Sequence, residues 1–89
     1  MEDLDRIPKK SNIRVKEQDG KYVIFNLETS GFHMIEKDAM DVINEIDGKK
    51  TIRELAEIFS KERKINQEEL EKDFVIFFND LAIRKIVEL

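Results

Sequence analysis

Residues 21–48 constrain the fold more strongly than any other part of this chain. They read as two short apolar strands joined by a turn and followed at once by a helix that ends near Asp47-Gly48. The last of these strands, Phe32–Ile35, is expected to have an outer edge free to pair with another strand. No residue pattern in this stretch is typical of catalysis, which favours a binding function.

A hairpin is predicted around Asp19-Gly20, between strands expected over Ile13–Gln18 and residues 21–27. Asp-Gly between two alternating runs is a strong hairpin signal, because both turn positions need a positive φ. A two-residue turn would place Val15 opposite Ile24. The return strand is apolar on both faces, so it is either covered on both sides or has one face that meets a partner. The two faces are Tyr22 with Ile24, and Val23 with Phe25 and Leu27.

Helices are predicted for the remainder of the chain. Gly48 stands where a left-handed C-cap would close the first helix. The sequence 51–54 is a capping box that opens the second helix, and the sequence 66–69 opens a third that runs to about Leu81. Residues 86–89 are expected to close the chain as a short strand. The apolar faces of the first two helices are Ala39, Val42, Ile43 and Ile46, then Ile52, Leu55, Ala56 and Phe59.

The third helix is apolar around most of its circumference. A single core stripe needs only Leu70, Phe74, Phe77 and Leu81, yet the chain adds Val75, Ile76 and Phe78. A helix of this kind is fully buried or borders a groove, and we expect Val75 and Phe78 to line one. Burial of the same surface in a homodimer is the main alternative.

The order of elements predicts an α+β fold. It is a winged helix-turn-helix-like domain, in which a three-stranded antiparallel N-terminal sheet is followed by three helices. Residues 1–12 are polar, contain the only proline and show no periodicity, so they are expected to form a flexible tail. Residues 13–89 are expected to form the single domain.

Composition excludes several classes of function. The chain has no cysteine, which excludes disulfides and thiolate chemistry and fits a cytoplasmic protein. Its net charge of −4, with acidic and basic residues interleaved, argues against a nucleic-acid partner. An acidic start with no long apolar run argues against a signal peptide or a membrane partner. His33 is the only histidine, so no catalytic residue, metal site or cofactor is expected.

Several short motifs resemble the PqqD-like family, the precursor-peptide recognition domains of ribosomally made, post-translationally modified peptides. They begin with the Glu-Thr-Ser-Gly turn at 28–31 before Phe-His-Met-Ile, and they span roughly residues 13–89. The chain departs from the family where Ile35-Glu36 replaces Leu-Asn and Lys85-Ile86 replaces Gly-Leu. The other matching residues are Ala39, Ile43, Asp47-Gly48, Thr51, Leu55, Ala56, Asp73, Phe74, Phe77, Leu81 and Ile86.

This resemblance implies a leader-peptide recognition protein. The leader would add as a strand beside Phe32–Ile35, in the groove between that strand and the third helix. The domain would then present the peptide to a modifying enzyme such as a radical S-adenosylmethionine maturase, a cyclase or a leader peptidase. We expect a monomer or a weak homodimer, and a winged-helix DNA-binding protein is the alternative. The expected peptide-binding residues are Phe32, His33, Met34, Ile35, Glu71, Lys72, Phe74, Val75 and Phe78, with Asp73 beside Lys72.

Overall fold

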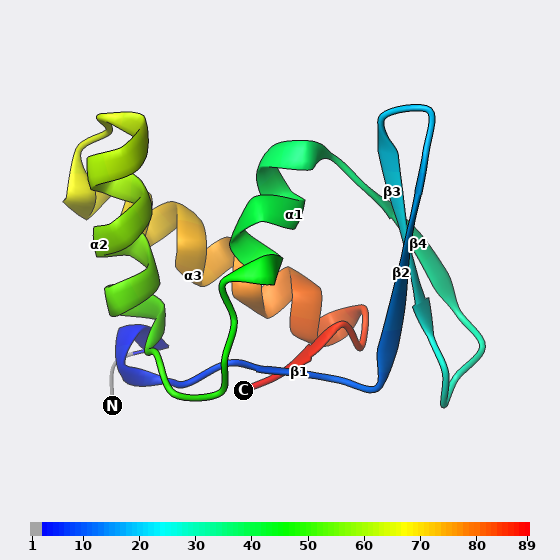
Figure 1. The fold of residues 1–89 in the computed structure, drawn as a ribbon. Helices are drawn as coiled ribbons and strands as arrows, with labels where there is room; N and C mark the ends of the chain where they lie inside the picture. The colour runs from blue at the N-terminus through cyan, green and yellow to red at the C-terminus, as the bar shows by residue number, and fades with distance from the viewer. Residues whose placement is uncertain (1–2) are drawn as a thin grey trace.

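The computed structural model describes residues 3–89, and it has the α+β fold that the sequence predicts (Figure 1). A three-stranded antiparallel sheet precedes three helices, and a second, two-stranded sheet joins the ends of the chain. The elements are η1 (a 3₁₀ helix, Asp3–Asp5), β1 (Lys9–Lys10), β2 (Ile13–Gln18), β3 (Lys21–Asn26), β4 (Phe32–Ile35), α1 (Lys37–Asn44), α2 (Ile52–Arg63), α3 (Gln67–Ile83) and β5 (Val87–Glu88).

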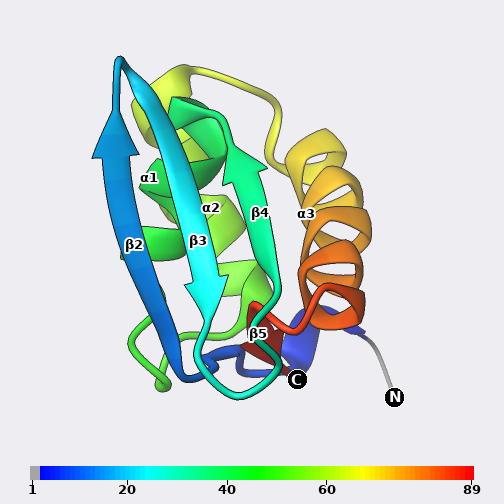
Figure 2. The ribbon, with the colours of Figure 1, turned by 90° about the vertical axis from the view of Figure 1, so that its right-hand side faces the viewer.

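The helices cover only one face of the larger sheet. In Figure 2, α1 and α2 lie behind strands β2, β3 and β4, and α3 runs alongside β4. Ile24 at the centre of β3 and Ile35 at the end of β4 point toward the helices and are buried in the core. The opposite face has no helix over it, so the strand with two apolar faces is covered on one side only.

The predicted hairpin register is confirmed. Val15 pairs with Ile24, and Arg14 pairs with Phe25. Asp19 and Gly20 both have positive φ, at 54° and 77°, which is the backbone conformation that a two-residue hairpin turn requires.

The helix ends follow the sequence signals in part. Thr51 and Glu54 form a reciprocal capping box at the start of α2, as predicted. Asn66 accepts a hydrogen bond from the Glu69 backbone at the start of α3. The prediction for Gly48 is wrong, because α1 already ends at Asn44 and Glu45 is its C-cap. Gly48 has a φ of 76° in the loop that follows.

The N-terminal segment differs from the flexible tail expected over residues 1–12. Residues 1–2 lie outside the described residues, but β1 pairs with β5 and thus ties the two ends of the chain together. The Ile52 backbone N–H donates to the Arg6 carbonyl at 3.0 Å, and the Ser11 N–H donates to the Ile86 carbonyl at 3.0 Å. Pro8 is buried. The segment is held by backbone hydrogen bonds, which carry no apolar periodicity and so left no signal in the sequence.

One buried polar side chain, Asn26, joins the sheet to α3. Its Nδ2 donates to the Lys85 carbonyl just after α3 at 2.7 Å. Its Oδ1 accepts from the backbone N–H groups of Glu28 and Thr29 at 2.8 and 2.9 Å. This amide therefore shapes the turn that leads into β4 and fixes that turn against the end of α3.

Replacing Asn26 with leucine should lower the free energy of unfolding by about 2–4 kcal/mol, because three part-buried backbone groups lose their partners. The exposed Asn79 on α3 provides the control, since Asn79→Leu should change stability by no more than about 0.5 kcal/mol. Urea denaturation of both variants measures the difference. Equal stabilities would contradict the role given to Asn26.

The loop after α1 should also respond to acid. Asp47 accepts hydrogen bonds from the backbone N–H groups of Lys49 and Lys50 and from the Lys50 ammonium, and these lower its pKa from 3.8 to about 2. A depressed pKa means that the contribution to stability is complete above pH 4 and is lost as the pH falls toward 2. Asp47→Asn should therefore be less stable than the parent near neutral pH, and this difference should shrink below about pH 3. A carboxyl titration followed by NMR with a midpoint near 4 would contradict this assignment.

Candidate peptide-binding site

Strand β4 has a free edge. It pairs with β3 on one side only, because the sheet order is β2-β3-β4. Its other side faces α3, which runs beside it in Figure 2. An unpaired strand edge exposes backbone N–H and C=O groups that can pair with an incoming strand.

The register identifies which backbone groups face outward. The Asn26 N–H donates to the Gly31 carbonyl, which makes this pair a hydrogen-bonded one. Hydrogen-bonded and non-hydrogen-bonded pairs alternate along an antiparallel ladder. The pairs Ile24–His33 and Tyr22–Ile35 are thus also hydrogen-bonded. The backbone groups of Phe32 and Met34 point away from β3, toward the free edge.

The side chains of β4 alternate between two environments. Ile35 is buried and His33 is half-buried, both on the face that meets the helices. Phe32 is 64% exposed and Met34 is 59% exposed, both on the uncovered face. The four predicted residues therefore do lie together, but only two of their side chains are freely accessible.

The uncovered face of the sheet is apolar along β3 and β4. The Phe25 and Phe32 rings pack with centroids 6.2 Å apart, and Leu27 beyond the end of β3 is also exposed. By the alternation of the strands, Arg14 and Lys16 of β2 lie on this same face. A contiguous exposed apolar surface of this kind is typical of a protein-binding site.

A pocket of about 230 Å³ lies between α1 and α3. We call it the α1–α3 pocket. Its α1 wall begins at Asp38, three residues after β4 ends, so this wall lies close to the end of that strand. The lining residues are Asp38, Ala39 and Val42 of α1, Arg63 of α2, and Leu70, Asp73, Phe74 and Phe77 of α3.

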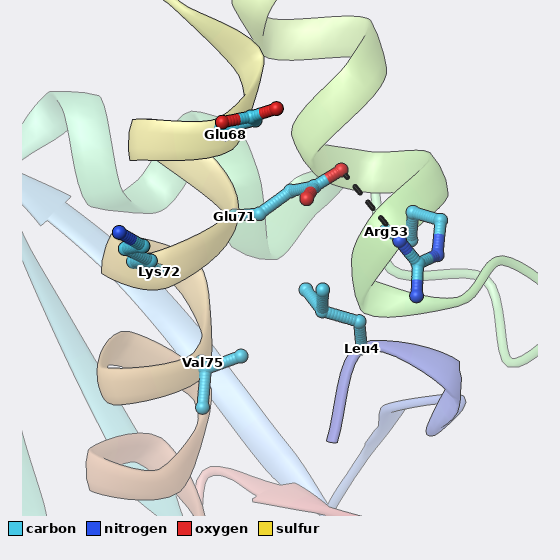
Figure 3. Close-up of a pocket in the computed structure, with 6 residues that line it drawn as sticks. All are labelled: Leu4, Arg53, Glu68, Glu71, Lys72 and Val75. Carbon is cyan, nitrogen blue, oxygen red and sulfur yellow. Dashed lines mark ion pairs between the residues drawn. The ribbon is translucent and has the colours of Figure 1, made fainter. Parts of the chain in front are cut away.

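Three predicted residues of α3 lie elsewhere. Glu71, Lys72 and Val75 line a different pocket of about 510 Å³, formed with Leu4 of η1, Arg53 of α2 and Glu68. Figure 3 shows Glu71 and Val75 on the side of α3 that faces α2 and η1. Because a helix has 3.6 residues per turn, these side chains are on the opposite flank from Asp73 and Phe77. The predicted position of Glu71 and Val75 beside β4 is therefore corrected, whereas Lys72 points away from α2 in Figure 3.

Glu71 connects α3 to α2 through an ion pair. It is within 4.0 Å of the Arg53 guanidinium and accepts a hydrogen bond from Gln67 at 3.1 Å. Arg53 also contacts Asp5 of η1, at 3.6 Å. The Glu71 carboxylate therefore has partners within the protein.

The burial of Phe77 and Phe78 is the reverse of what the sequence predicted. Phe78 is fully buried and Phe74 is nearly so, whereas Phe77, expected in the core, is only partly buried and borders the α1–α3 pocket. Phe78 therefore cannot line a groove in this structure. Five apolar residues in succession give no indication of which flank is buried, so the position of Phe77 at the pocket was not predicted.

Within the described residues, neither a metal-binding group nor a membrane-spanning helix is found. Residues 3–89 contain no group of three or more histidine, cysteine or carboxylate side chains that could hold a metal ion. None of the described helices is long and apolar enough to cross a membrane.

The arrangement defines a winged-helix-like α+β domain with an open strand edge beside its last helix. Residues 21–87 match the sequence profile of the family described as Coenzyme PQQ synthesis protein D (PqqD). The chain belongs to the PqqD family, as its sequence motifs indicated. A comparison with curated protein sequences finds no match.

Two solved structures share the fold. TbiB1 in complex with the TbiA(beta) leader peptide is 18% identical, with a TM-score of 0.77 over 90% of this chain and 94% of that one. The second is the PqqD truncation of Methylobacterium extorquens PqqCD, described as a functional, stand-alone recognition element for ribosomally synthesised and post-translationally modified peptides. It is 20% identical, with a TM-score of 0.74 over 92% of this chain and 88% of that one.

The burial of Phe78 gives a direct test of the site's boundaries. Phe78→Ala should lower the free energy of unfolding by about 3–5 kcal/mol, because it leaves a cavity among the Phe74 and Phe77 rings. Ile76→Ala, at a neighbouring position that is 70% exposed, should change it by no more than about 0.5 kcal/mol. Thermal or urea unfolding measures both, and a Phe78→Ala protein of parental stability would contradict the assignment to the core.

Proposed function

We propose that this protein captures the leader segment of a ribosomally made precursor peptide as an additional strand on the free edge of β4. The observation that carries the proposal is the outward orientation of the Phe32 and Met34 backbone groups beside α3. Strand addition of this kind obtains affinity from main-chain hydrogen bonds and specificity from pockets for alternate side chains. Membership of the PqqD family and the leader peptide bound to the structurally similar TbiB1 support the same function.

The proposed protein is a binding module with no catalytic step of its own. It would hold the leader in the cytoplasm, where precursor peptides are made, and present it to a modifying enzyme. The uncovered sheet face supports this second contact, since Phe25, Leu27 and Phe32 expose apolar surface adjoining the β4 edge. A leader on β4 would extend the same sheet, so that enzyme and peptide would meet side by side.

DNA binding is less well supported by the geometry. The third helix would have to enter the major groove, yet its exposed residues include the carboxylates of Glu69, Asp73 and Asp80. Such side chains repel the phosphate backbone, whose neutralisation by basic residues supplies most of the affinity in protein–DNA complexes.

Hydrogen exchange at single amides tests the proposed edge. The probe is the leader segment of the small peptide encoded nearest to this protein's gene. In the free protein, the Phe32 and Met34 amides should exchange rapidly and the His33 amide slowly, because only His33 faces β3. Adding the leader should slow exchange at Phe32 and Met34, with little change at His33.

Met34→Pro removes one outward N–H and should abolish leader binding without unfolding the domain, because proline is tolerated on an edge strand. Met34→Ala keeps the N–H and should retain most of the affinity. Calorimetry measures both. Unchanged binding by the proline variant, or protection that requires only a second copy of this chain, would refute strand addition of the leader.

A further inference from the structure

We infer that the α1–α3 pocket accepts a lysine or arginine side chain of the leader, and that this contact sets which leader is chosen. The inference rests on the proposed function, because it takes the peptide to lie along β4. It concerns the identity of one leader residue, which membership of the family does not specify.

The size of the pocket suits one side chain. Its volume of about 230 Å³ is below the roughly 300–1,000 Å³ typical of sites that hold an entire small molecule. The apolar part of the lining consists of Ala39, Val42, Leu70, Phe74 and Phe77. This surface offers contacts to the methylene groups of a long side chain.

Two carboxylates without partners stand on opposite walls of this pocket. Asp38 comes from α1 and Asp73 from α3, and both residues are exposed. Neither carboxylate has a hydrogen bond or ion pair with any residue of the described chain, 3–89. On the same two helices, Asp41 lies 3.5 Å from Lys37, and Asp80 lies 3.0 Å from Arg84.

The single basic residue of the pocket does not compensate these charges. The Arg63 guanidinium donates to the backbone carbonyl of Asp38 at 2.8 Å and lies over the Phe59 ring at 4.9 Å. Two carboxylates against one guanidinium leave the rim with a net negative charge. A long side chain with an apolar stem and a cationic head matches both the lining and the rim.

The strand geometry limits where that residue can stand. Successive side chains of an added strand point to opposite faces of the sheet. Only alternate leader residues would face the helices, as His33 and Ile35 do in β4, and the basic residue must be one of these. Its neighbours in the leader would face the uncovered side.

The test combines variants of the protein with variants of the leader. The double variant Asp38→Asn, Asp73→Asn should weaken leader binding about fivefold to twentyfold, as expected for charge-assisted contacts that are partly exposed to solvent. Glu62→Gln, which removes one negative charge from an exposed position on α2, should leave affinity unchanged. Because both substituted aspartates are exposed, the variants should be as stable as the parent protein. An unfolding curve of each variant checks that the domain is intact.

Leader variants make the same test without altering the protein. Each lysine or arginine of the leader is replaced in turn by methionine, which keeps the stem and removes the charge. One replacement should weaken binding to the parent protein and have no further effect on the double variant. Asp73→Lys should in turn favour a leader carrying glutamate at that one position.

The outcomes separate this inference from the proposed function. If the Phe32 and Met34 amides are protected by the leader but no basic residue couples to Asp38 or Asp73, the leader binds at the edge and the inference about the pocket is overturned. If those amides remain unprotected at saturating leader, the proposed function fails and the inference fails with it. Coupling of one basic leader residue to Asp38 or Asp73 supports both the proposed function and the inference about the pocket.

Discussion

The position of the free β4 edge depends on the hydrogen bonds of one buried amide. Asn26 ends β3, shapes the turn into β4 and holds the Lys85 carbonyl beyond α3, so it links the sheet to the last helix at a single point. At its other end, β4 is fixed by the burial of Ile35, directly before α1. Asn26 therefore holds the start of β4 against the end of α3, and Ile35 anchors the other end of this four-residue strand in the core. A peptide added to this edge would meet a surface that is already in place, which would lower the entropic cost of binding.

The one-sided cover of the sheet explains why the molecule has surfaces left for partners. The helices α1 and α2 cover one face of the sheet, and α3 lies beside β4 instead of over the second face. A short edge strand next to a helix is also less open to pairing with copies of itself than a long one would be. The short β4 edge beside α3 therefore limits self-association and still leaves room for one added strand.

Features encoded by neighbouring residues could be predicted from the sequence. The Asp19-Gly20 turn fixed the hairpin register, and Thr51 with Glu54 marked the start of α2, because turn and cap geometry need only a few adjacent residues. Features that depend on distant contacts could not be predicted. The β1–β5 pair joins residues almost eighty positions apart, and α1 ends at Asn44, four residues before Gly48.

The flank of α3 that lies beside β4 was predicted wrongly for Glu71, Val75 and Phe78, and the cause is physical. Phe74 to Phe78 are all apolar, so hydrophobic periodicity cannot distinguish the buried flank from either exposed one. The polar residues do distinguish them in the structure. Glu71 is engaged by Gln67 and Arg53 and serves to hold α3 in place, whereas Asp73 has no partner in the described chain and lines the pocket near β4.

This division between the two flanks suggests how affinity and selectivity are separated in the proposed complex. Hydrogen bonds to the Phe32 and Met34 backbone are available to any extended peptide, so they contribute affinity without reading sequence. Discrimination then has to come from side chains, and an unpaired carboxylate at a pocket rim penalises an acidic leader as well as favouring a basic one. Asp38 and Asp73 are exposed and take no part in the core, so substitutions there can change which leader is chosen while the strand edge and the fold stay the same.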